Sequence, residues 1–454
     1  MVHAVSDHRL VSLVHLGCAR NLIDSELILG RMAEEGLVIT DDPAAAQAVV
    51  VNTCSFIGPA REESLGIIRE LLERKRRGEI GSVVVAGCLV QRYRRKLREE
   101  LPEVDLFAEI SDYTNLARSV RELTDGKAIP DYLEGPAQRE ARREGGRLLA
   151  TPASYAFLRI SHGCDHQCSF CTIPSIRGTH RSKGLADLLE EGRELAACGV
   201  RELVLVAEDS TAWGRDAGRE LPELVEALAD LSGIHRVRVM YAYPNRLPAG
   251  LSDLLRDHPR VATYLDMPIQ HVSTPILRAM RRHGSGEQVR EIVGRLFDEV
   301  PGLTLRTTLL VGFPGEREED LEELCAFLRE FRLTRVGAFP YSNEEGTPSQ
   351  ALDGSLPTEE VLQRTRAVLA VRDELLRASQ AARVGEELEV LVDEADRGPG
   401  AVARGETDAP EVDTVALVSE SNAQPGDVLR VRVEDIDDEA NLLCKPCVPV
   451  PVDR

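Results

Sequence analysis

Short apolar runs alternate with amphipathic stretches along the first third of the 454-residue chain. The apolar runs predict buried strands over residues 11–17, 48–53, 82–86 and 104–110. Apolar positions at helical spacing predict helices over residues 21–36, 59–77 and 114–123, with one more after the third strand. Strands and helices that alternate with short turns are typical of an α/β fold with a parallel, doubly wound sheet.

The same alternation resumes after a polar, Gly- and Pro-containing stretch at residues 134–146, which we interpret as a linker. Strands are predicted over residues 157–161, 202–207, 236–241, 263–267, 304–311 and 335–340. Helices between them are predicted over residues 185–197, 222–231, 275–282 and 318–331. Six strand–helix units predict an open, partial TIM-like (β/α)6 barrel, whose chemistry we expect at the carboxyl ends of the strands.

The pattern changes again after a long amphipathic helix predicted over residues 358–383. Short strands separated by Gly and Pro turns are predicted over residues 388–392, 401–403, 414–418, 428–433 and 441–444. They predict a small antiparallel, OB-like β-barrel. The resulting domain ranges are 1–145, 146–383 and 384–454.

Composition narrows the class of protein. No apolar run approaches the roughly 18 residues of a membrane span, and the first ten residues lack the apolar core of a secretory signal. We therefore expect a cytoplasmic protein. The net charge of −21 argues against strong direct binding to nucleic acid and favours a cationic partner, although general solubility is an alternative reading.

Three cysteines lie close together after the first strand of the middle region. Cys164, Cys168 and Cys171 have the spacing C-x₃-C-x₂-C. Three thiolates can hold three irons of a cubane [4Fe–4S] cluster and leave the fourth iron open for chemistry.

A second set of three cysteines is dispersed in sequence. Cys18, Cys54 and Cys88 each directly follow a predicted strand of the first domain. Parallel strands bring their carboxyl ends to one edge of a sheet, so these thiols are predicted to form a second three-cysteine site. Simple burial as small hydrophobic residues is the alternative, and zinc is the competing metal, for which no neighbouring histidine offers a fourth ligand.

Four other cysteines have no such pattern. Cys198 and Cys325 lie in helical patterns and are predicted to be core residues. Cys444 and Cys447 form a lone C-x-x-C pair without further ligands in view, which we interpret as structurally incidental rather than metal-binding or redox-active.

Together the six cysteines resemble those of the radical S-adenosylmethionine (SAM) methylthiotransferases, over nearly the whole chain. GCARNLIDSE, NTCSFIGPAREES, YLDMPIQH and YSNEEGTP resemble the ribosomal-protein branch rather than the transfer-RNA branch. The C-terminal barrel resembles a TRAM domain. Two positions depart from the family pattern, since Arg20 replaces an expected lysine and Glu208 an expected glutamine.

The resemblance implies methylthio transfer to the β-carbon of an aspartate of small-subunit ribosomal protein twelve. It implies that Cys164, Cys168 and Cys171 hold the [4Fe–4S] cluster that cleaves SAM, with Glu208, Asp209 and Gln270 as SAM contacts. Cys18, Cys54 and Cys88 would hold an auxiliary [4Fe–4S] cluster that delivers sulfur. An electron donor and a sulfur donor are implied as partners, and the substrate is the free protein or the assembled small subunit.

The last domain sharpens the choice of substrate. From residue 384 to the end it carries 18 Asp or Glu against 6 Lys or Arg, and no Phe, Tyr or Trp. RNA-binding surfaces are basic and aromatic, so this domain is predicted to dock a cationic protein, unless its charge is merely a solvated surface. The alternative functions are methylthiolation of an adenosine in transfer RNA and a zinc-stabilised, non-catalytic binding protein.

Overall fold

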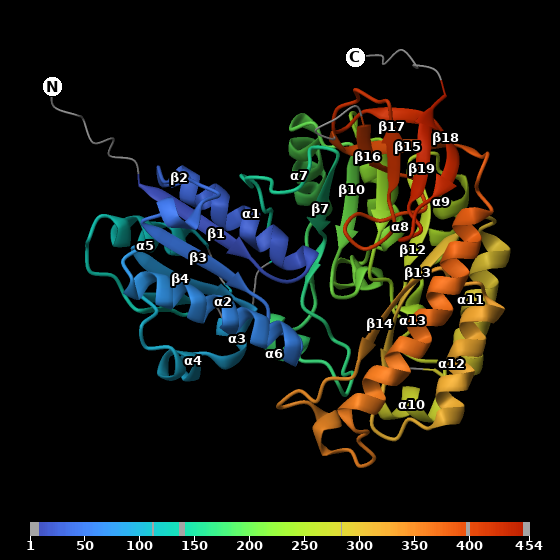
Figure 1. Cartoon of the computed structure of the whole chain (residues 1–454), viewed down its shortest axis with the longest axis horizontal. Helices are drawn as coiled ribbons and strands as arrows, with labels where there is room; N and C mark the ends of the chain where they lie inside the picture. The colour runs from blue at the N-terminus through green and yellow to red at the C-terminus, as the bar shows by residue number, and fades with distance from the viewer. Residues whose placement is uncertain (1–8, 111–112, 136–140, 283, 396–399, 448–454) are drawn as a thin grey trace. The chain divides into compact units, whose positions relative to one another are not determined.

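The computed structural model describes residues 9–110, 113–135, 141–282, 284–395 and 400–447 (Figure 1). These divide into two compact units. The first contains the chain up to Ala150 together with His162–Asp165 and Cys171–Thr179. The second contains Thr151–Ser161, His166–Phe170 and the chain from His180 onward. Part of the predicted linker, residues 136–140, lies outside the described residues.

The first unit is built on a six-stranded parallel sheet with the order β2-β1-β3-β4-β5-β6. The strands are β1 (Leu10–His15), β2 (Val38–Ile39), β3 (Ala48–Thr53), β4 (Ser82–Gly87), β5 (Leu106–Ala108) and β6 (Tyr132–Leu133). The helices are α1 (Ala19–Glu34), α2 (Gly58–Arg76), α3 (Cys88–Tyr93), α4 (Arg95–Glu100), α5 (Tyr113–Thr124) and α6 (Ile173–Arg177), with a 3₁₀ turn at Pro43–Ala45. The predicted parallel sheet is confirmed, with two additional edge strands that are too short to show a periodic pattern.

Helices cover both faces of this sheet, as expected for a doubly wound fold. The face that carries Val49, Val51, Val83 and Val85 packs on apolar residues of α2, α3 and α4. Helices α1 and α5 pack on each other and on β3 from the other side. Because β3 and β4 are covered on both faces, every residue from Ala48 to Thr53 is buried.

The second unit begins with six parallel strands that neighbour one another in chain order. They are β7 (Tyr155–Arg159), β10 (Glu202–Val206), β11 (Arg236–Val239), β12 (Val261–Asp266), β13 (Thr304–Val311) and β14 (Arg335–Pro340). The order is open at both edges among the described residues, so the predicted partial barrel is confirmed. A separate two-stranded pair joins β8 (Ser161–His162) and β9 (Arg181–Ser182).

Helices separate these strands and turn the chain back to begin the next one. They are α7 (Leu185–Ala197), α8 (Leu221–Ala229), α9 (Leu251–Asp257), α10 (Thr274–Ala279), α11 (Gly286–Glu299) and α12 (Glu318–Glu330). Single 3₁₀ turns lie at Ser210–Ala212, Arg215–Ala217, Pro244–Arg246 and Pro348–Ala351. We predicted no range for α9 or α11.

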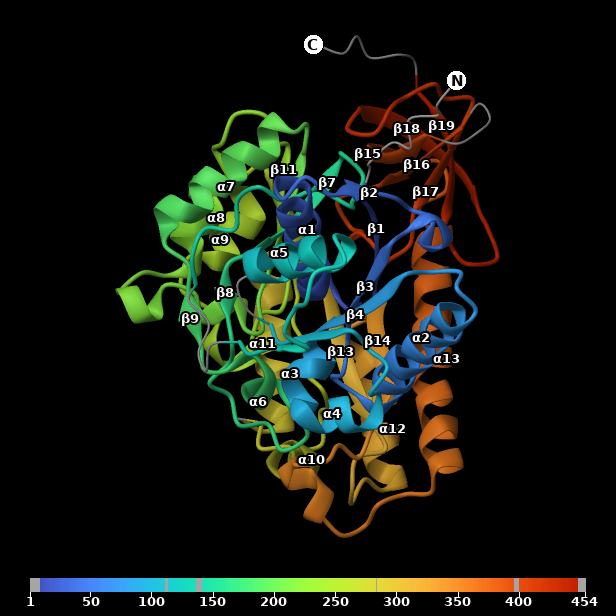
Figure 2. The ribbon, with the colours of Figure 1, turned by 90° about the vertical axis from the view of Figure 1, so that its left-hand side faces the viewer.

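Helix α13 (Thr358–Ala381) runs from beside β14 to the C-terminal barrel (Figures 1 and 2). The barrel closes in the order β15-β16-β17-β19-β18. Its strands are β15 (Glu387–Ala395), β16 (Gly400–Arg404), β17 (Ala416–Ser419), β18 (Val428–Ile436) and β19 (Leu442–Pro446). The predicted small barrel is confirmed; four strand pairs are antiparallel and β17 with β19 is parallel.

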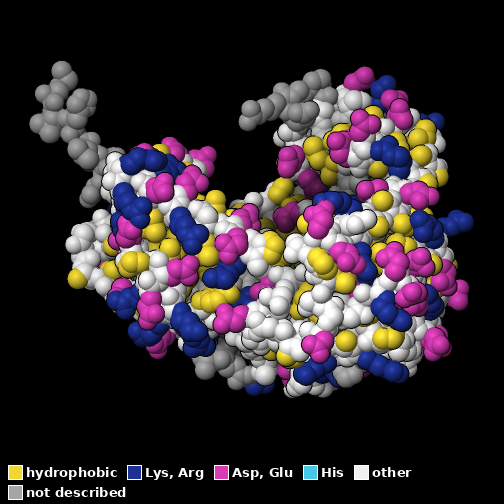
Figure 3. Space-filling view, turned by 60° about the horizontal axis from the view of Figure 1, so that its bottom comes forward, with side chains coloured by type: hydrophobic (Ala, Val, Ile, Leu, Met, Phe, Trp, Pro, Cys, Tyr) yellow, Lys and Arg dark blue, Asp and Glu magenta, His cyan; other side chains and the backbone are white. Residues whose placement is uncertain are grey.

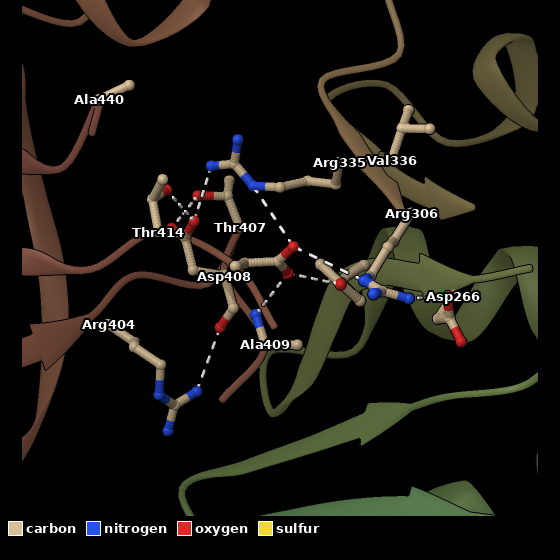
Figure 4. Close-up of polar contacts among 12 residues, drawn as sticks. Asp266, Arg306, Arg335, Val336, Arg404, Thr407, Asp408, Ala409, Thr414 and Ala440 are labelled. Carbon is tan, nitrogen blue, oxygen red and sulfur yellow. Dashed lines mark hydrogen bonds and ion pairs between the residues drawn. The ribbon is translucent and has the colours of Figure 1, made fainter. Parts of the chain in front are cut away.

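Buried ion pairs join the C-terminal barrel to the six-stranded sheet of the same unit. Arg404 of β16 contacts Glu202, the first residue of β10, at 3.1 Å. Asp408 accepts a hydrogen bond of 2.6 Å from Arg335, the first residue of β14 (Figure 4). Since Glu202 and Arg335 begin their strands, the C-terminal barrel lies against the amino ends of these strands, at the edge opposite their carboxyl ends.

Candidate metal centres

The three dispersed cysteines lie at the carboxyl ends of three neighbouring strands, as predicted. Cys18 precedes α1 shortly after β1, Cys54 directly follows β3, and Cys88 follows β4 and begins α3. Strands β1, β3 and β4 are adjacent and parallel, so their ends share one edge of the sheet. Cys54 and Cys88 are buried and Cys18 is half-buried.

Two observations bring these thiols together. A Cβ atom built on Gly17 would lie 2.7 Å from the Cβ of Cys54 and 3.1 Å from its sulfur, so the β1–α1 turn packs directly on Cys54. The pKa of the Cys54 thiol is raised to about 11, first by burial and then by the charges of Cys88 and Cys18. The mutual charge effect agrees with three thiols that share one edge of the sheet.

Two buried asparagines fix the turns that carry these cysteines. The side-chain amide of Asn21 donates to the backbone oxygen of Thr53 at 3.3 Å. The side chain of Asn52 donates to the backbone oxygen of Asn21 at 2.9 Å and to Ser25 at 2.8 Å. Both asparagines are fully buried. Each asparagine lies two or three residues from a cysteine, in GCARN and NTC. Each donates a hydrogen bond to the backbone of the other turn and so fixes the turns that carry the cysteines.

The donor set suits an iron–sulfur cluster. Cluster irons are commonly held by cysteine thiolates, and each thiolate of a cubane binds a different iron, so the ligands stand apart. Within the described ranges no three His, Cys, Asp or Glu side chains gather closely enough to hold a single metal ion. Three thiols at one edge of the sheet provide the three cysteine ligands that such a cluster requires when one iron is left open.

The cysteines of the C-x₃-C-x₂-C loop are distributed over the two units. Cys164 and Cys171 are half-buried and belong to the first unit, where the backbone N–H of Cys164 donates to Gly178 at 3.1 Å. Cys168 is buried in the second unit, and the next residue, Ser169, donates through its backbone to Met280 at 2.9 Å. The binding of one cluster by all three remains a prediction from their spacing.

The predicted SAM contacts occupy the carboxyl ends of strands in the second unit. Asp209 is buried after β10 and lies 2.7 Å from Nε2 of His166, a residue of the cysteine loop. Burial raises the pKa of Asp209, but hydrogen bonds from His166 and Thr211 outweigh it and lower the pKa overall. The imidazole of His166 stacks on the Tyr243 ring at 3.7 Å. Asp209 therefore contacts the cysteine loop through His166, a contact that sequence reasoning missed.

Glu208 and Gln270 are both half-buried at these strand ends. Gln270 has a left-handed backbone (φ 70°) and bonds along β13 through Thr308 and Leu310, at 2.9 and 2.8 Å. Its position is thus fixed by the sheet. Contact of these two residues with SAM stays a prediction.

Neither Cys198 nor Cys325, the two cysteines predicted to be core residues, is fully buried. Cys198 is exposed because it caps the C-terminus of α7, so its prediction as a core residue is wrong. Cys325 is half-buried. Cys444 is buried in the apolar core of the C-terminal barrel and Cys447 is half-buried.

Three family models match the chain. Residues 10–109 match a family described as uncharacterized protein family UPF0004, residues 158–328 match the radical SAM superfamily, and residues 384–442 match the TRAM domain. A radical SAM domain implies one [4Fe–4S] cluster and SAM.

Curated relatives span the whole architecture. The "Ribosomal protein uS12 methylthiotransferase RimO" of Sorangium cellulosum is 40% identical, over 95% of this chain and 89% of that protein. The RimO protein of Porphyromonas gingivalis is 42% identical, over 92% of this chain and 94% of its own length. The chain belongs to the RimO family of radical SAM methylthiotransferases. The resemblance found in the sequence is thereby confirmed.

Solved structures support the fold. The radical SAM methyltransferase TsrM of Kitasatospora setae superposes with a TM-score of 0.56 at 17% identity, covering 86% of this chain and 79% of TsrM. No helix in the described part of the chain is both long and apolar enough to cross a membrane.

Proposed function

We propose that this enzyme transfers a methylthio group to the β-carbon of an aspartate of ribosomal protein uS12, using two [4Fe–4S] clusters. The observation that carries the proposal is the convergence of Cys18, Cys54 and Cys88 at one sheet edge. A radical SAM domain needs one cluster, and this second thiol site accounts for a sulfur-delivering one. The names of the relatives supply the substrate.

Each part of the chain has a separate task in this proposal. Cys164, Cys168 and Cys171 hold the cluster that binds SAM, and Cys18, Cys54 and Cys88 hold the auxiliary cluster. When bound, these groups supply the 5′-deoxyadenosyl radical, which can attack an unactivated C–H bond, and the sulfur for transfer. The protein's side chains contribute position: Asp209 orients His166 and with it the cysteine loop, while Glu208 and Gln270 stand where SAM contacts are expected. An electron donor and a sulfur donor complete the reaction, in the cytoplasm.

The acidic C-terminal barrel is the proposed docking surface for the basic substrate. Asp393, Asp408 and Asp413 are unavailable for docking, because they are buried and contact arginines. Many other carboxylates of the domain are exposed, among them Glu420, Glu434, Asp435, Asp438 and Glu439. On the face shown in Figure 3, acidic and basic side chains are interspersed and no continuous basic band crosses the coloured residues. The exposed carboxylates favour a cationic protein over a phosphate backbone as the docking partner.

The exposed carboxylates permit a direct test of docking. Replacing Asp435, Asp438 and Glu439 by their amides in the full chain should raise the KM for uS12 several-fold at low salt and leave kcat unchanged. High salt should remove the difference, because it screens exposed charges. An unchanged KM at low salt would show that the substrate binds elsewhere.

Mass spectrometry decides the function. Ribosomal protein uS12 and assembled small subunits, incubated with the reconstituted enzyme, SAM, sulfide and a reductant, should gain a methylthio group on one aspartate. If an adenosine of transfer RNA gains the methylthio group and uS12 stays unmodified, the substrate is transfer RNA and the assignment to uS12 is wrong. Iron and labile sulfide should reach about eight each per chain, as two four-iron clusters require. Stoichiometric zinc without iron would instead support a binding protein.

A further inference from the structure

Arg177 is a buried cation at the auxiliary site that the predicted ligand set does not include. It is the last residue of α6, and its side chain is only 2% exposed. One of its terminal nitrogens, Nη2, donates to Oδ2 of Asp24 at 2.9 Å. Asp24 lies in α1 and is fully buried. A buried arginine is held in place by such a carboxylate, and its orientation is therefore fixed.

The same nitrogen reaches the auxiliary cysteines. Nη2 of Arg177 donates to the sulfur of Cys88 at 3.4 Å. Burial raises the pKa of Cys88, and Arg177 opposes this rise. At Cys18 burial also raises the pKa, but the charges of Arg20 and Arg177 prevail and lower it overall. One guanidinium thus acts on two of the three thiols.

The segment that supplies Arg177 begins at the other cysteine motif. Arg177 follows Cys171 by six positions, in the run CTIPSIR. Pro174 stands in the first turn of α6, where its fixed backbone favours the helix. Helix α6 packs on α3, whose first residue is Cys88, and Thr172 donates to the backbone oxygen of Phe56 at 3.4 Å. The chain leaving the radical SAM motif is therefore anchored on the auxiliary site, within one compact unit.

We propose that Arg177 is a positioning residue of the auxiliary cluster, whose guanidinium, fixed by Asp24, donates to the Cys88 sulfur and sets the charge beside the cluster. This inference rests on the proposed two-cluster function. Hydrogen bonds to cluster sulfurs and nearby charge are the protein's means of setting a cluster potential. A buried positive charge stabilises the more negative, reduced cluster and so raises its reduction potential.

The test measures that potential on the auxiliary cluster alone. In the full chain with Cys164, Cys168 and Cys171 replaced by alanine, only the auxiliary site can load. The midpoint potential is then read by redox titration with electron paramagnetic resonance. Arg177→Met should move the one-electron equilibrium at least tenfold toward the oxidised cluster, which corresponds to about 59 mV. Arg177→Lys keeps a positive charge at this position and should move the equilibrium less.

A second buried arginine, which pairs with a carboxylate on the same helix as Asp24, provides a matched control. Arg147 is also a buried arginine, and it contacts Glu26 of α1 at 3.1 Å. Arg147→Met removes a similar ion pair and should leave the potential unchanged. Equal shifts of the midpoint potential in Arg147→Met and Arg177→Met would indicate mere structural damage and overturn the proposal. An Arg177→Met variant with the same potential as the protein without this substitution would also overturn it.

The remaining outcomes are also decisive. If Arg177→Met does not fold, Arg177→Gln, which also removes the charge but keeps a polar side chain, takes its place, and an unchanged potential in that variant overturns the role of Arg177. If the parent protein with Cys18, Cys54 and Cys88 intact loads no cluster, the two-cluster function falls and this proposal with it. Loading with a potential that is insensitive to Arg177 overturns only the positioning role.

Discussion

Gly17 shows how closely the auxiliary site is packed. Its φ of +111° is rarely adopted by other residues, and an added Cβ would lie 2.7 Å from the Cβ of Cys54. We expect Gly17→Ala to displace Cys54 or the turn itself and to prevent the auxiliary cluster from loading. Iron measured per chain after reconstitution should fall by about half, since one of two four-iron clusters is lost.

Gly36 provides the matched control. It also has a positive φ, +78°, but nothing lies within 4 Å of its added Cβ. Gly36→Ala carries the same kind of backbone strain without the steric conflict and should keep its full iron content. Equal iron in both variants would contradict the placement of Cys54 at a cluster.

At Asp209 the expected effect falls on the other cluster. Asp209→Asn replaces the charged acceptor of the 2.7 Å contact with His166 by a neutral amide. The cysteine loop loses a charge-assisted hydrogen bond, and SAM cleavage should slow about tenfold, equivalent to about 1.4 kcal/mol in the barrier. Formation of 5′-deoxyadenosine in the presence of a chemical reductant measures this rate. The auxiliary cluster should still load; a rate equal to that of the unmodified enzyme would refute the positioning role.

Single residues differ in how far sequence could predict them. Cys18, Cys54 and Cys88 could be grouped because each follows a strand, and strand ends meet at one edge. Arg177 and Asp24 could not, since their contact joins positions 153 apart and depends on how α6 packs. Asp209 was found for its place at a strand end, but its contact with His166 is visible only in the folded chain.

At the scale of elements, helix α11 illustrates a missed signal. Its hydrophobic positions alone do not give its bounds, but Ser285 and Gln288 form the capping pair that marks a helix start. Ser285 Oγ accepts from the backbone of Gln288 at 3.3 Å, and the Gln288 side chain accepts from the backbone of Ser285 at 3.0 Å. Strand–helix alternation was predictable from hydrophobic runs, whereas β2 and β6, with two residues each, are too short to show a pattern.

The cap makes a quantitative prediction. Ser285→Ala should lower the free energy of unfolding of the second unit by about 1 kcal/mol, the usual value of such a cap. Trp213 is the single tryptophan and is buried in that unit, so its fluorescence follows urea unfolding. Ser285→Thr retains the hydroxyl and should lower the free energy of unfolding by less than Ser285→Ala. A loss in Ser285→Ala no greater than in Ser285→Thr would argue against the cap.

At the scale of the whole chain, charge is used in two ways. The excess of carboxylates in the last domain was read from sequence as a docking surface. Part of it instead joins the barrel to the sheet: Arg335 contacts Asp408 at 2.6 Å and Arg306 contacts Asp413 at 3.7 Å. The net charge of the domain does not tell which carboxylates are buried in ion pairs and which are exposed, and only the folded structure separates the two groups. The carboxyl ends of the strands are left to the cysteine loop and its neighbours.

Glu202 is central to the buried ion pairs between the C-terminal barrel and the sheet, and it makes them sensitive to acid. The carboxylate is fully buried; burial raises its pKa, but Arg238, Arg404 and Arg236 outweigh burial and lower the pKa to about 2. A carboxyl whose pKa is depressed on folding stabilises the protein above its ordinary pKa of 4.5, and this stabilisation disappears as the pH falls from about 4.5 to about 2. Protonation leaves three buried arginines with less counter-charge.

Glu202→Gln imitates the protonated state at every pH. At pH 7 the variant should lose roughly 3 kcal/mol of unfolding free energy, as when one partner of a buried ion pair is removed. Below pH 4.5 the difference from the unmodified protein should shrink, because Glu202 takes up a proton in the unfolded chain while it is still charged in the folded protein, and this proton uptake favours unfolding. Urea unfolding followed by Trp213 fluorescence between pH 7 and pH 3 measures both quantities. Glu223, whose ion pair with Arg219 is exposed, gives the control, and Glu223→Gln should change little at any pH. A difference between Glu202→Gln and the unmodified protein that stays constant from pH 7 to pH 3 would mean that folding does not lower the pKa of Glu202, and the acid sensitivity would have to originate elsewhere.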